Sequence, residues 1–239
     1  MTKQAINDLN SQLTNSIGDN LKLIQELYGD SVVFTTSFGA EDQLITYFIS
    51  KMNTRITIST LDTGRLFPET YDVWESTRKK YNLTIKPYYP NTKAVEELVE
   101  KKGPYSFYES IENRKECCFV RKVEPLKRAL AGNKVWVTGL RAEQSENRSN
   151  LEPIEWDEVN QIIKYHPLLM YSWEEVMKQI HTFGIPYNVL HDKGYPSIGC
   201  QPCTRAVLEG EDSRAGRWWW ENSKKECGLH QIELKQKNT

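Results

Sequence analysis

Residues 31–42 read SVVFTTSFGAED and predict a strand, a tight turn and the beginning of a helix. The run SVVFTT at 31–36 is β-branched and apolar, which is typical of a buried strand. The turn at Ser37–Gly39 leads into a helix predicted over 40–52. The free N–H groups at such a helix start can bind an anion, although this turn matches neither a P-loop nor a GxGxxG pattern. Glu41 and Asp42 are equally well explained as partners of the helix dipole.

The same alternation of strand and helix continues along the chain. Further strands are predicted at 55–61, 83–88, 134–138, 162–166 and 186–190. Helices are predicted at 4–28, 68–81, 92–102, 115–131 (bent or broken by Pro125) and 173–183. Alternating elements of this kind predict an α/β fold with a mostly parallel sheet flanked by helices.

Ligands of such sheets bind at the carboxyl ends of the strands, so we expect the chemistry in the loops at 37–42, 61–67 and 139–148. Each of these loops combines a glycine with a polar or charged residue. From about residue 193 the regular pattern fades into a segment rich in Gly, Cys, Arg and Trp. We therefore divide the chain into a nucleotide-binding α/β domain at 1–192 and an active-site extension at 193–239. Packing is the expected role of the Trp218–Trp220 run.

Composition excludes several classes of function. The formal net charge of −1 provides no basic field for nucleic acid. No segment approaches the roughly 20 apolar residues of a membrane span, and the first residues show no apolar run after a basic start. We expect a cytoplasmic protein in a reducing compartment, where cysteines serve metal binding or catalysis more often than disulfides.

Basic residues gather near the cysteines in spite of the near-neutral total. Arg114, Lys115, Arg121 and Lys122 bracket one cysteine pair, and Arg205, Arg214 and Arg217 follow the other. Each of these residues alone is well explained as part of a solvated surface. Together they indicate a small anionic ligand held near the cysteines.

Four of the five cysteines form two pairs, Cys117-Cys118 and Cys200-Gln201-Pro202-Cys203. Four soft ligands suit either zinc or an iron–sulfur cluster. Adjacent cysteines on a helix point about 100° apart, which makes it awkward for both to reach one small ion. A [4Fe–4S] cluster offers them different irons, so the spacing favours a cluster over zinc. Buried structural thiols are the third alternative.

The fifth cysteine, Cys227, stands in Lys224-Lys225-Glu226-Cys227-Gly228-Leu229-His230. Two nearby lysines favour the thiolate, which is the reactive form. An inert surface thiol explains the residue equally well on this spacing alone.

With these segments in view, the chain resembles the assimilatory adenylyl-sulfate reductases, the iron–sulfur branch of the family that reduces adenylyl and phosphoadenylyl sulfate (APS and PAPS). The resemblance spans about 31–230 and rests on SFGAED, LDTGRLFPET, KECCFVRKVEPL, TGLRAEQS, GCQPCTR, RAGRWWW and ECGLH. It implies an adenine-nucleotide α-hydrolase-like fold. It also implies an oxidoreductase of sulfate assimilation and cysteine biosynthesis, which reduces adenosine 5′-phosphosulfate (APS) to sulfite and AMP with thioredoxin as partner.

The resemblance also assigns roles to residues. It implies that Cys227 attacks the sulfur to give an S-sulfocysteine, and that Cys117, Cys118, Cys200 and Cys203 bind a [4Fe–4S] cluster. The substrate contacts that it implies are Ser37, Gly39, Leu61, Asp62, Thr63, Gly64, Arg65, Lys122, Gly139, Arg141, Arg214, Arg217 and His230. Lys122 would link the cluster electrostatically to the substrate. The resemblance does not decide whether Thr36 or Ser37 contacts the phosphate. It also leaves open whether the protein forms a homo-oligomer.

Three alternatives compete with this interpretation. A reductase of 3′-phosphoadenylyl sulfate (PAPS), or one of dual specificity, belongs to the same family, but members restricted to PAPS generally lack the four cluster cysteines. A metal-bearing redox sensor would bind nucleotide without turnover. An adenylating enzyme of the same fold would carry an SGGxDS-like loop, which residues 37–42 do not supply.

Overall fold

A computed structural model describes residues 2–144, 148 and 150–221 of the chain. Its sheet has the order β3-β2-β1-β4-β6-β5. All neighbouring strands are parallel except β5, which runs antiparallel to β6. The strands are β1 (Val32–Thr36), β2 (Thr57–Leu61), β3 (Ile85–Tyr88), β4 (Val135–Val137), β5 (Ile154–Asp157) and β6 (Ile162–Tyr165). The predicted mostly parallel sheet is confirmed, and the strand order reverses between β1 and β4, where such folds bind ligands.

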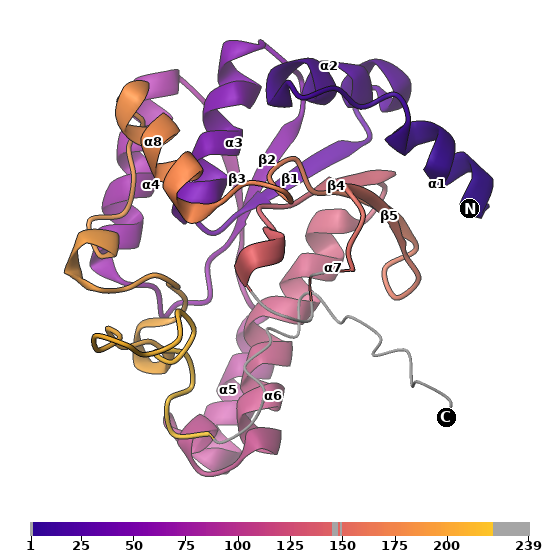
Figure 1. Cartoon of the computed structure of the whole chain (residues 1–239). Coiled ribbons are helices and arrows are strands. Elements are labelled where there is room, and N and C mark those ends of the chain that lie inside the picture. Colours follow the sequence, from indigo (N-terminus) through magenta and orange to yellow (C-terminus); the bar gives the residue numbers. More distant parts are fainter. Residues whose placement is uncertain (1, 145–147, 149, 222–239) are drawn as a thin grey trace, which may run out of the picture.

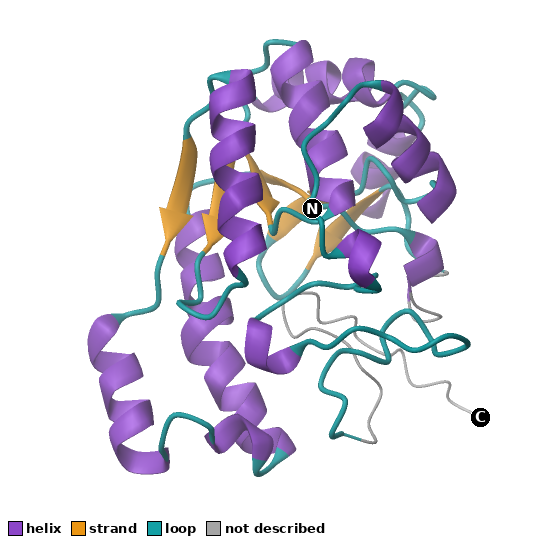
Figure 2. Ribbon diagram, turned by 90° about the vertical axis from the view of Figure 1, so that its left-hand side faces the viewer, coloured by secondary structure: helices purple, strands orange, loops and turns teal. Residues whose placement is uncertain are grey.

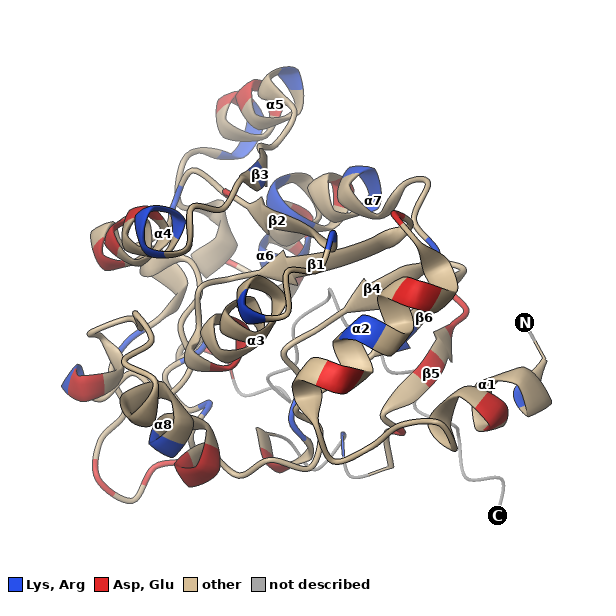
Figure 3. Cartoon of the chain, turned by 90° about the horizontal axis from the view of Figure 1, so that it is seen from above, with Lys and Arg blue, Asp and Glu red and all other residues tan. Residues whose placement is uncertain are grey.

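Helices cover both faces of this sheet (Figures 1 and 2). They are α1 (Lys3–Asn10), α2 (Ile17–Tyr28), α3 (Ala40–Lys51), α4 (Pro68–Tyr81), α5 (Thr92–Lys102), α6 (Ile111–Cys118), α7 (Glu124–Leu130) and α8 (Trp173–Thr182). Successive side chains of a strand point to opposite faces. Accordingly Val32 and Phe34 of β1 join the core under α2 and α3, whereas Val33 packs against Leu126 and Leu130 of α7. Acidic and basic residues are mixed along the outer helices (Figure 3).

The predicted helix at 115–131 is longer and more continuous than expected. Helices α6 and α7 are joined by η2, a π-helical stretch over Phe119–Val123. Pro125, which was expected to bend or break the helix, lies in the first turn of α7 instead. Proline has no N–H group to donate, which a helix tolerates in its first turn, and the π-helical stretch ends immediately before this turn. Cys117 and Cys118 are the last two residues of α6, which lies below the sheet in the view of Figure 1.

Three further expectations need correction. The predicted helix at 4–28 is two helices, because the Asn20 side chain binds Thr14 and Ser16 caps α2 with its hydroxyl group. The strand predicted at 186–190 is absent: Asn188 accepts the Leu190 N–H, which folds this segment into a turn. Strand β5 was not predicted.

Residues 193–221 run irregularly across the carboxyl edge of the sheet, with the short 3₁₀ turn η6 (Gln201–Cys203) in their course. Trp218 is buried against Phe107 and Cys203, in agreement with the packing role predicted for it, whereas Trp219 is exposed. In the described part of the chain, no helix is both long and apolar enough to cross a membrane.

Candidate active site

A cavity of about 500 Å³ opens at the carboxyl edge of the sheet. Its volume falls in the range of roughly 300–1,000 Å³ that small-molecule sites occupy. The ends of β1, β2 and β4 supply one wall, and the segment after residue 193 supplies another. Nine of the predicted substrate contacts line this cavity: Ser37, Gly39, Leu61, Thr63, Lys122, Gly139, Arg141, Arg214 and Arg217. The three loops predicted to converge at this edge therefore do so.

The turn after β1 is closed by a carboxyl group of the protein itself. The Ser37 N–H and hydroxyl groups both donate to Asp42 Oδ2, at 2.6 Å and 2.7 Å. Asp42 is buried, and this burial raises the pKa of its carboxyl group to about 7. Gly139 approaches so closely that a Cβ atom would collide with Asp42 Oδ1. Gly139 is therefore required by the packing of two loops.

Phe38, in the same turn, adopts a left-handed backbone with φ +62°, which is uncommon for a residue with a side chain. Its ring stacks on Trp74 with the ring centroids 5.4 Å apart, and its N–H donates to Thr36 Oγ1 at 3.0 Å. The Thr36 hydroxyl thus supports the turn from within, whereas Ser37 binds Asp42. Both residues line the cavity.

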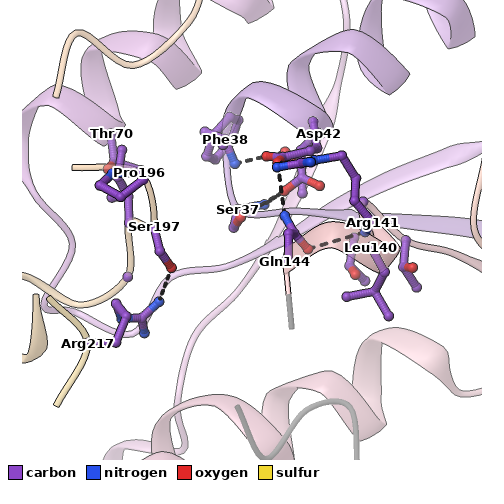
Figure 4. A pocket seen from close by; sticks show the side chains of 18 of the residues that line it. Ser37, Phe38, Asp42, Thr70, Leu140, Arg141, Gln144, Pro196, Ser197 and Arg217 are labelled. Carbon is purple, nitrogen blue, oxygen red and sulfur yellow. Dashed lines mark hydrogen bonds and ion pairs between the residues drawn. The ribbon is translucent and has the colours of Figure 1, made fainter. Parts of the chain in front are cut away.

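The loop after β4 is held by a network of ion pairs. Arg141 Nε donates to Glu41 Oε1 at 2.8 Å, and Gln144 Nε2 donates to the same oxygen at 2.9 Å. Arg141 also pairs with Glu143 at 2.5 Å. The backbone N–H of Trp173, together with Arg141, lowers the pKa of Glu143. Figure 4 shows Arg141 and Gln144 beside Asp42, with Arg217 across the cavity. Arg141 therefore orders the loop as well as lining the cavity.

Three predicted contacts in the loop after β2 do not line this cavity. Asp62 is buried and accepts hydrogen bonds from Gly64 N–H at 2.8 Å and from Tyr71 Oη at 2.9 Å. Burial, followed by the bond to Asp62, raises the pKa of Tyr71 to about 12. Gly64 bends the loop with φ +70°, and Arg65 donates to the Pro104 carbonyl at 2.6 Å. Asp62 and Gly64 thus shape the loop, while Arg65 points toward the cysteines.

A second, smaller cavity is bordered by all four of the paired cysteines. Cys117 and Cys118 come from the end of α6, whereas Cys200 immediately precedes η6 and Cys203 is its last residue. The cationic side chains around it are Arg65, Arg114, Arg121 and Lys122. No group of three or more His, Cys, Asp or Glu side chains within the described ranges is arranged to hold a metal ion. The four thiols instead surround a space.

This donor set is compatible with an iron–sulfur cluster. Burial raises the pKa of the Cys117 and Cys203 thiols, so buried thiolates here need a compensating positive partner. Arg121 and Arg65 lie close enough to Cys117 to oppose that rise. Four cysteine sulfurs around one space match the ligand set that a [4Fe–4S] cluster takes, and the surrounding cations would offset the charge of the thiolates.

The two cavities are neighbours. Cys200 and Lys122 border both of them. Arg217, which is buried, lies against Gly199, where a Cβ atom would stand only 2.6 Å from its Cζ atom. The Arg217 Nη1 group donates to Ser197 Oγ at 3.3 Å. A ligand in the larger cavity therefore lies next to the cysteine site.

Some lining residues were not predicted, among them Thr138, Trp173, His191 and Ser197. Thr138 begins the TGLRAEQS segment but had been given no role of its own. Trp173, His191 and Ser197 lie outside the segments that carry the resemblance, so no motif indicated them. Cys227 and His230, by contrast, were predicted but lie outside the described residues.

A family model for the phosphoadenosine phosphosulfate reductase domain matches residues 31–206. The chain belongs to this family. An adenosine 5′-phosphosulfate reductase of Allochromatium vinosum is 53% identical over 86% of this chain and 80% of its own length. One from Sinorhizobium fredii (strain USDA 257) is 47% identical over 96% of this chain and 91% of its own length. Family membership confirms the prediction of an enzyme, an oxidoreductase acting on sulfur.

Solved structures agree with the fold of this reductase family. The phosphoadenylyl-sulfate reductase of Candida auris superposes with a TM-score of 0.72 and 30% identity, covering 87% of this chain and 98% of its own. A Candida glabrata FMN adenylyltransferase has a TM-score of 0.54 at 17% identity, over 97% of this chain and 77% of its own, which shows a common fold alone. The predicted adenine-nucleotide α-hydrolase-like fold is confirmed.

Proposed function

We propose that this enzyme reduces adenosine 5′-phosphosulfate to sulfite and AMP with thioredoxin as the electron donor. The observation that carries the proposal is the junction of two cavities: a nucleotide-sized one at the strand ends and one bordered by four cysteines, with Cys200 and Lys122 common to both. Relatives named adenosine 5′-phosphosulfate reductase, at 47–53% identity, support this substrate.

The cations of the larger cavity suit the anionic end of such a substrate. Arg214 and Arg217 line the cavity from the segment after residue 193, and Lys122 lines it from η2. Attack at sulfur places charge on the sulfonyl oxygens and on the departing phosphate. Fixed cations that face this charge stabilise the transition state. We assign these three side chains to the sulfate and phosphate groups.

We assign the nucleophile to Cys227, which lies outside the described residues. Its thiolate attacks the sulfur, the bond between sulfur and the phosphate oxygen breaks, and AMP leaves with the bonding electrons. The S-sulfocysteine is then attacked by a thiolate of reduced thioredoxin, whose two thiols supply two electrons. Sulfite, the regenerated Cys227 thiol and oxidised thioredoxin are the products. His230 is proposed to contact the substrate or to influence this thiolate.

Cys117, Cys118, Cys200 and Cys203 would hold a [4Fe–4S] cluster. When bound, the cluster supplies a charged group beside the cavity and tunes the field at the sulfate end. Lys122 borders both cavities, so its ammonium group can interact with both the cysteine site and the substrate anion. This assignment places the chain in the iron–sulfur branch of the family.

The proposed setting is the cytoplasm, in assimilatory sulfate reduction that leads to cysteine. Thioredoxin and the nucleotide are the proposed partners, with no nucleic acid or membrane. Residues 1–192 would bind the nucleotide, and 193–239 would form the extension with Cys200, Cys203 and Cys227.

A second candidate is the reduction of PAPS, alone or together with APS. The Candida auris relative, named a phosphoadenylyl-sulfate reductase, favours testing it. Sulfite formation should be measured with each nucleotide and reduced thioredoxin. We expect a higher kcat/KM with adenosine 5′-phosphosulfate, and faster turnover of the 3′-phosphorylated substrate would overturn the assignment. Cys227→Ser should abolish sulfite formation while AMP binding and iron content persist.

A further inference from the structure

Three side chains joined by hydrogen bonds connect the partly exposed Glu155, through the buried His166, to Thr138 at the large cavity. His166, just after β6, is 1% exposed. Its Nδ1 atom lies 2.6 Å from Thr138 Oγ1, and its Nε2 atom lies 3.3 Å from Glu155 Oε1 of β5. Thr138, just after β4, is buried and lines the cavity. The proposed reaction has not used any of these three groups.

The hydrogen-bonding properties of Glu155 and His166 determine which atoms of these three side chains carry hydrogens. The Glu155 carboxylate can only accept, so His166 Nε2 must carry a hydrogen. Burial lowers the pKa of His166, which keeps the imidazole neutral and leaves Nδ1 as an acceptor. The Thr138 hydroxyl therefore donates its hydrogen to His166 Nδ1.

The Thr138 oxygen has only acceptor capacity left, because its single hydrogen is engaged. An acceptor on a cavity wall suits a ligand N–H or O–H group and repels the oxygens of a phosphate or sulfate. The cationic side chains Lys122, Arg214 and Arg217 line the same cavity and suit those anions. One part of the cavity wall therefore suits anionic oxygens, and Thr138 suits a hydrogen-bond donor of the ligand.

We propose that Thr138 is a specificity-determining residue, whose oxygen accepts a hydrogen bond from a hydroxyl or amino group on the nucleoside part of the ligand. His166 is a positioning residue, which Glu155 holds in the tautomer that turns the Thr138 hydroxyl inward. This inference rests on the proposed function, because it takes the ligand to be an adenine nucleotide.

The test is the affinity of the full chain for AMP, 2′-deoxy-AMP, 3′-deoxy-AMP and inosine monophosphate, measured by calorimetry. In the wild type, one analogue that lacks the donor should bind about tenfold more weakly than AMP. Thr138→Val should bind AMP about tenfold more weakly and should bind that analogue as well as it binds AMP. Thr138→Ser, which keeps the hydroxyl group, should retain the wild-type preference.

His166 is tested by two matched variants. The Asn side chain of His166→Asn can place its oxygen near the former Nδ1 position, so the preference for AMP should persist. His166→Leu removes the acceptor of the Thr138 hydroxyl group. The ratio of the affinity for AMP to the affinity for the analogue should then fall toward one. Circular dichroism of each variant monitors folding, and the Ser and Asn variants keep the proposal testable if the apolar variants do not fold.

These measurements distinguish a failure of the roles assigned to Thr138 and His166 from a failure of the proposed function. If every analogue shows the same ratio to AMP in the wild type and in Thr138→Val, the role of Thr138 is overturned and the proposed function stands. Equal loss of preference in the Asn and Leu variants overturns the role of His166. If the wild type does not bind AMP, both the proposed function and this inference fail.

Discussion

The Arg114 guanidinium and the Glu221 carboxylate form a two-pronged ion pair in the interior of the protein. Arg114 Nε and Nη2 donate to the two carboxylate oxygens at 2.7 Å and 2.9 Å, and both side chains are less than a tenth exposed. The pair joins helix α6, which carries Cys117 and Cys118, to a residue six positions before Cys227.

Removing one partner of this pair should destabilise the protein strongly. Glu221→Ala leaves the Arg114 charge buried and unpaired, which should lower the free energy of unfolding by about 3 kcal/mol. Urea denaturation of the protein as isolated measures this change. The exposed pair Arg55–Asp30 provides the control, because Asp30→Ala should cost less than about 1 kcal/mol. Equal costs at the two sites would contradict the structural role of the buried pair.

Alanine at residue 199 should displace Arg217 from the cavity. A Cβ atom there would stand 2.6 Å from Arg217 Cζ, so the guanidinium must move. Gly199→Ala should therefore lower kcat/KM for adenosine 5′-phosphosulfate about tenfold, the effect of losing roughly 1.4 kcal/mol of charge stabilisation. Gly18→Ala is the control, because its neighbour there is the flexible end of Met52. An unchanged kcat/KM in Gly199→Ala would contradict the role of Arg217.

The buried carboxyl group of Asp42 should make stability depend on pH. Its pKa is raised from 3.8 in the unfolded chain to about 7 in the fold, so the contribution of Asp42 is fully present below pH 4. That contribution is lost as pH rises toward 7, because the unfolded state then binds fewer protons than the folded state. Between pH 5 and pH 8 the wild type should lose about 2 kcal/mol relative to Asp42→Asn. Parallel stability curves for the two proteins over this range would show that Asp42 ionises normally.

The four cysteines should bind iron rather than zinc. Purified without air, the protein should contain about four iron and four inorganic sulfide per chain, as a [4Fe–4S] cluster requires. Cys118→Ser should lose most of this iron. Metal analysis that finds zinc in stoichiometric amount and no sulfide would contradict the cluster.

Local patterns in the sequence predicted much of the fold. The β-branched run at 31–36 is β1, and Pro68 begins α4 as expected of a proline in a first turn. Strand β5 was missed although it pairs with β6 across a short turn, because its four residues are too few to show a periodicity. Its other contact comes from far away in the sequence: Asn10, 144 positions earlier, binds the Ile154 N–H and carbonyl at 2.9 Å each.

The candidate site was predictable where a motif carries it. The four paired cysteines and nine of the residues predicted to contact the substrate border two adjoining cavities. The sequence did not predict that Arg65 borders the cysteine cavity and not the larger one. A loop that combines a glycine with an arginine does not specify which of two neighbouring cavities the arginine side chain lines. Likewise Thr138 and His166 are single residues at strand ends, and only the register of β4 beside β6 brings them together.

In the proposed reaction, Cys227 carries the sulfur intermediate. Mass spectrometry of the anaerobic full chain, mixed with adenosine 5′-phosphosulfate in the absence of thioredoxin, tests it most directly. We predict an adduct of the mass of an SO₃ group on the peptide that contains Cys227, which thioredoxin then removes as sulfite. An adduct on another cysteine, or no adduct while AMP is released, would contradict the claim.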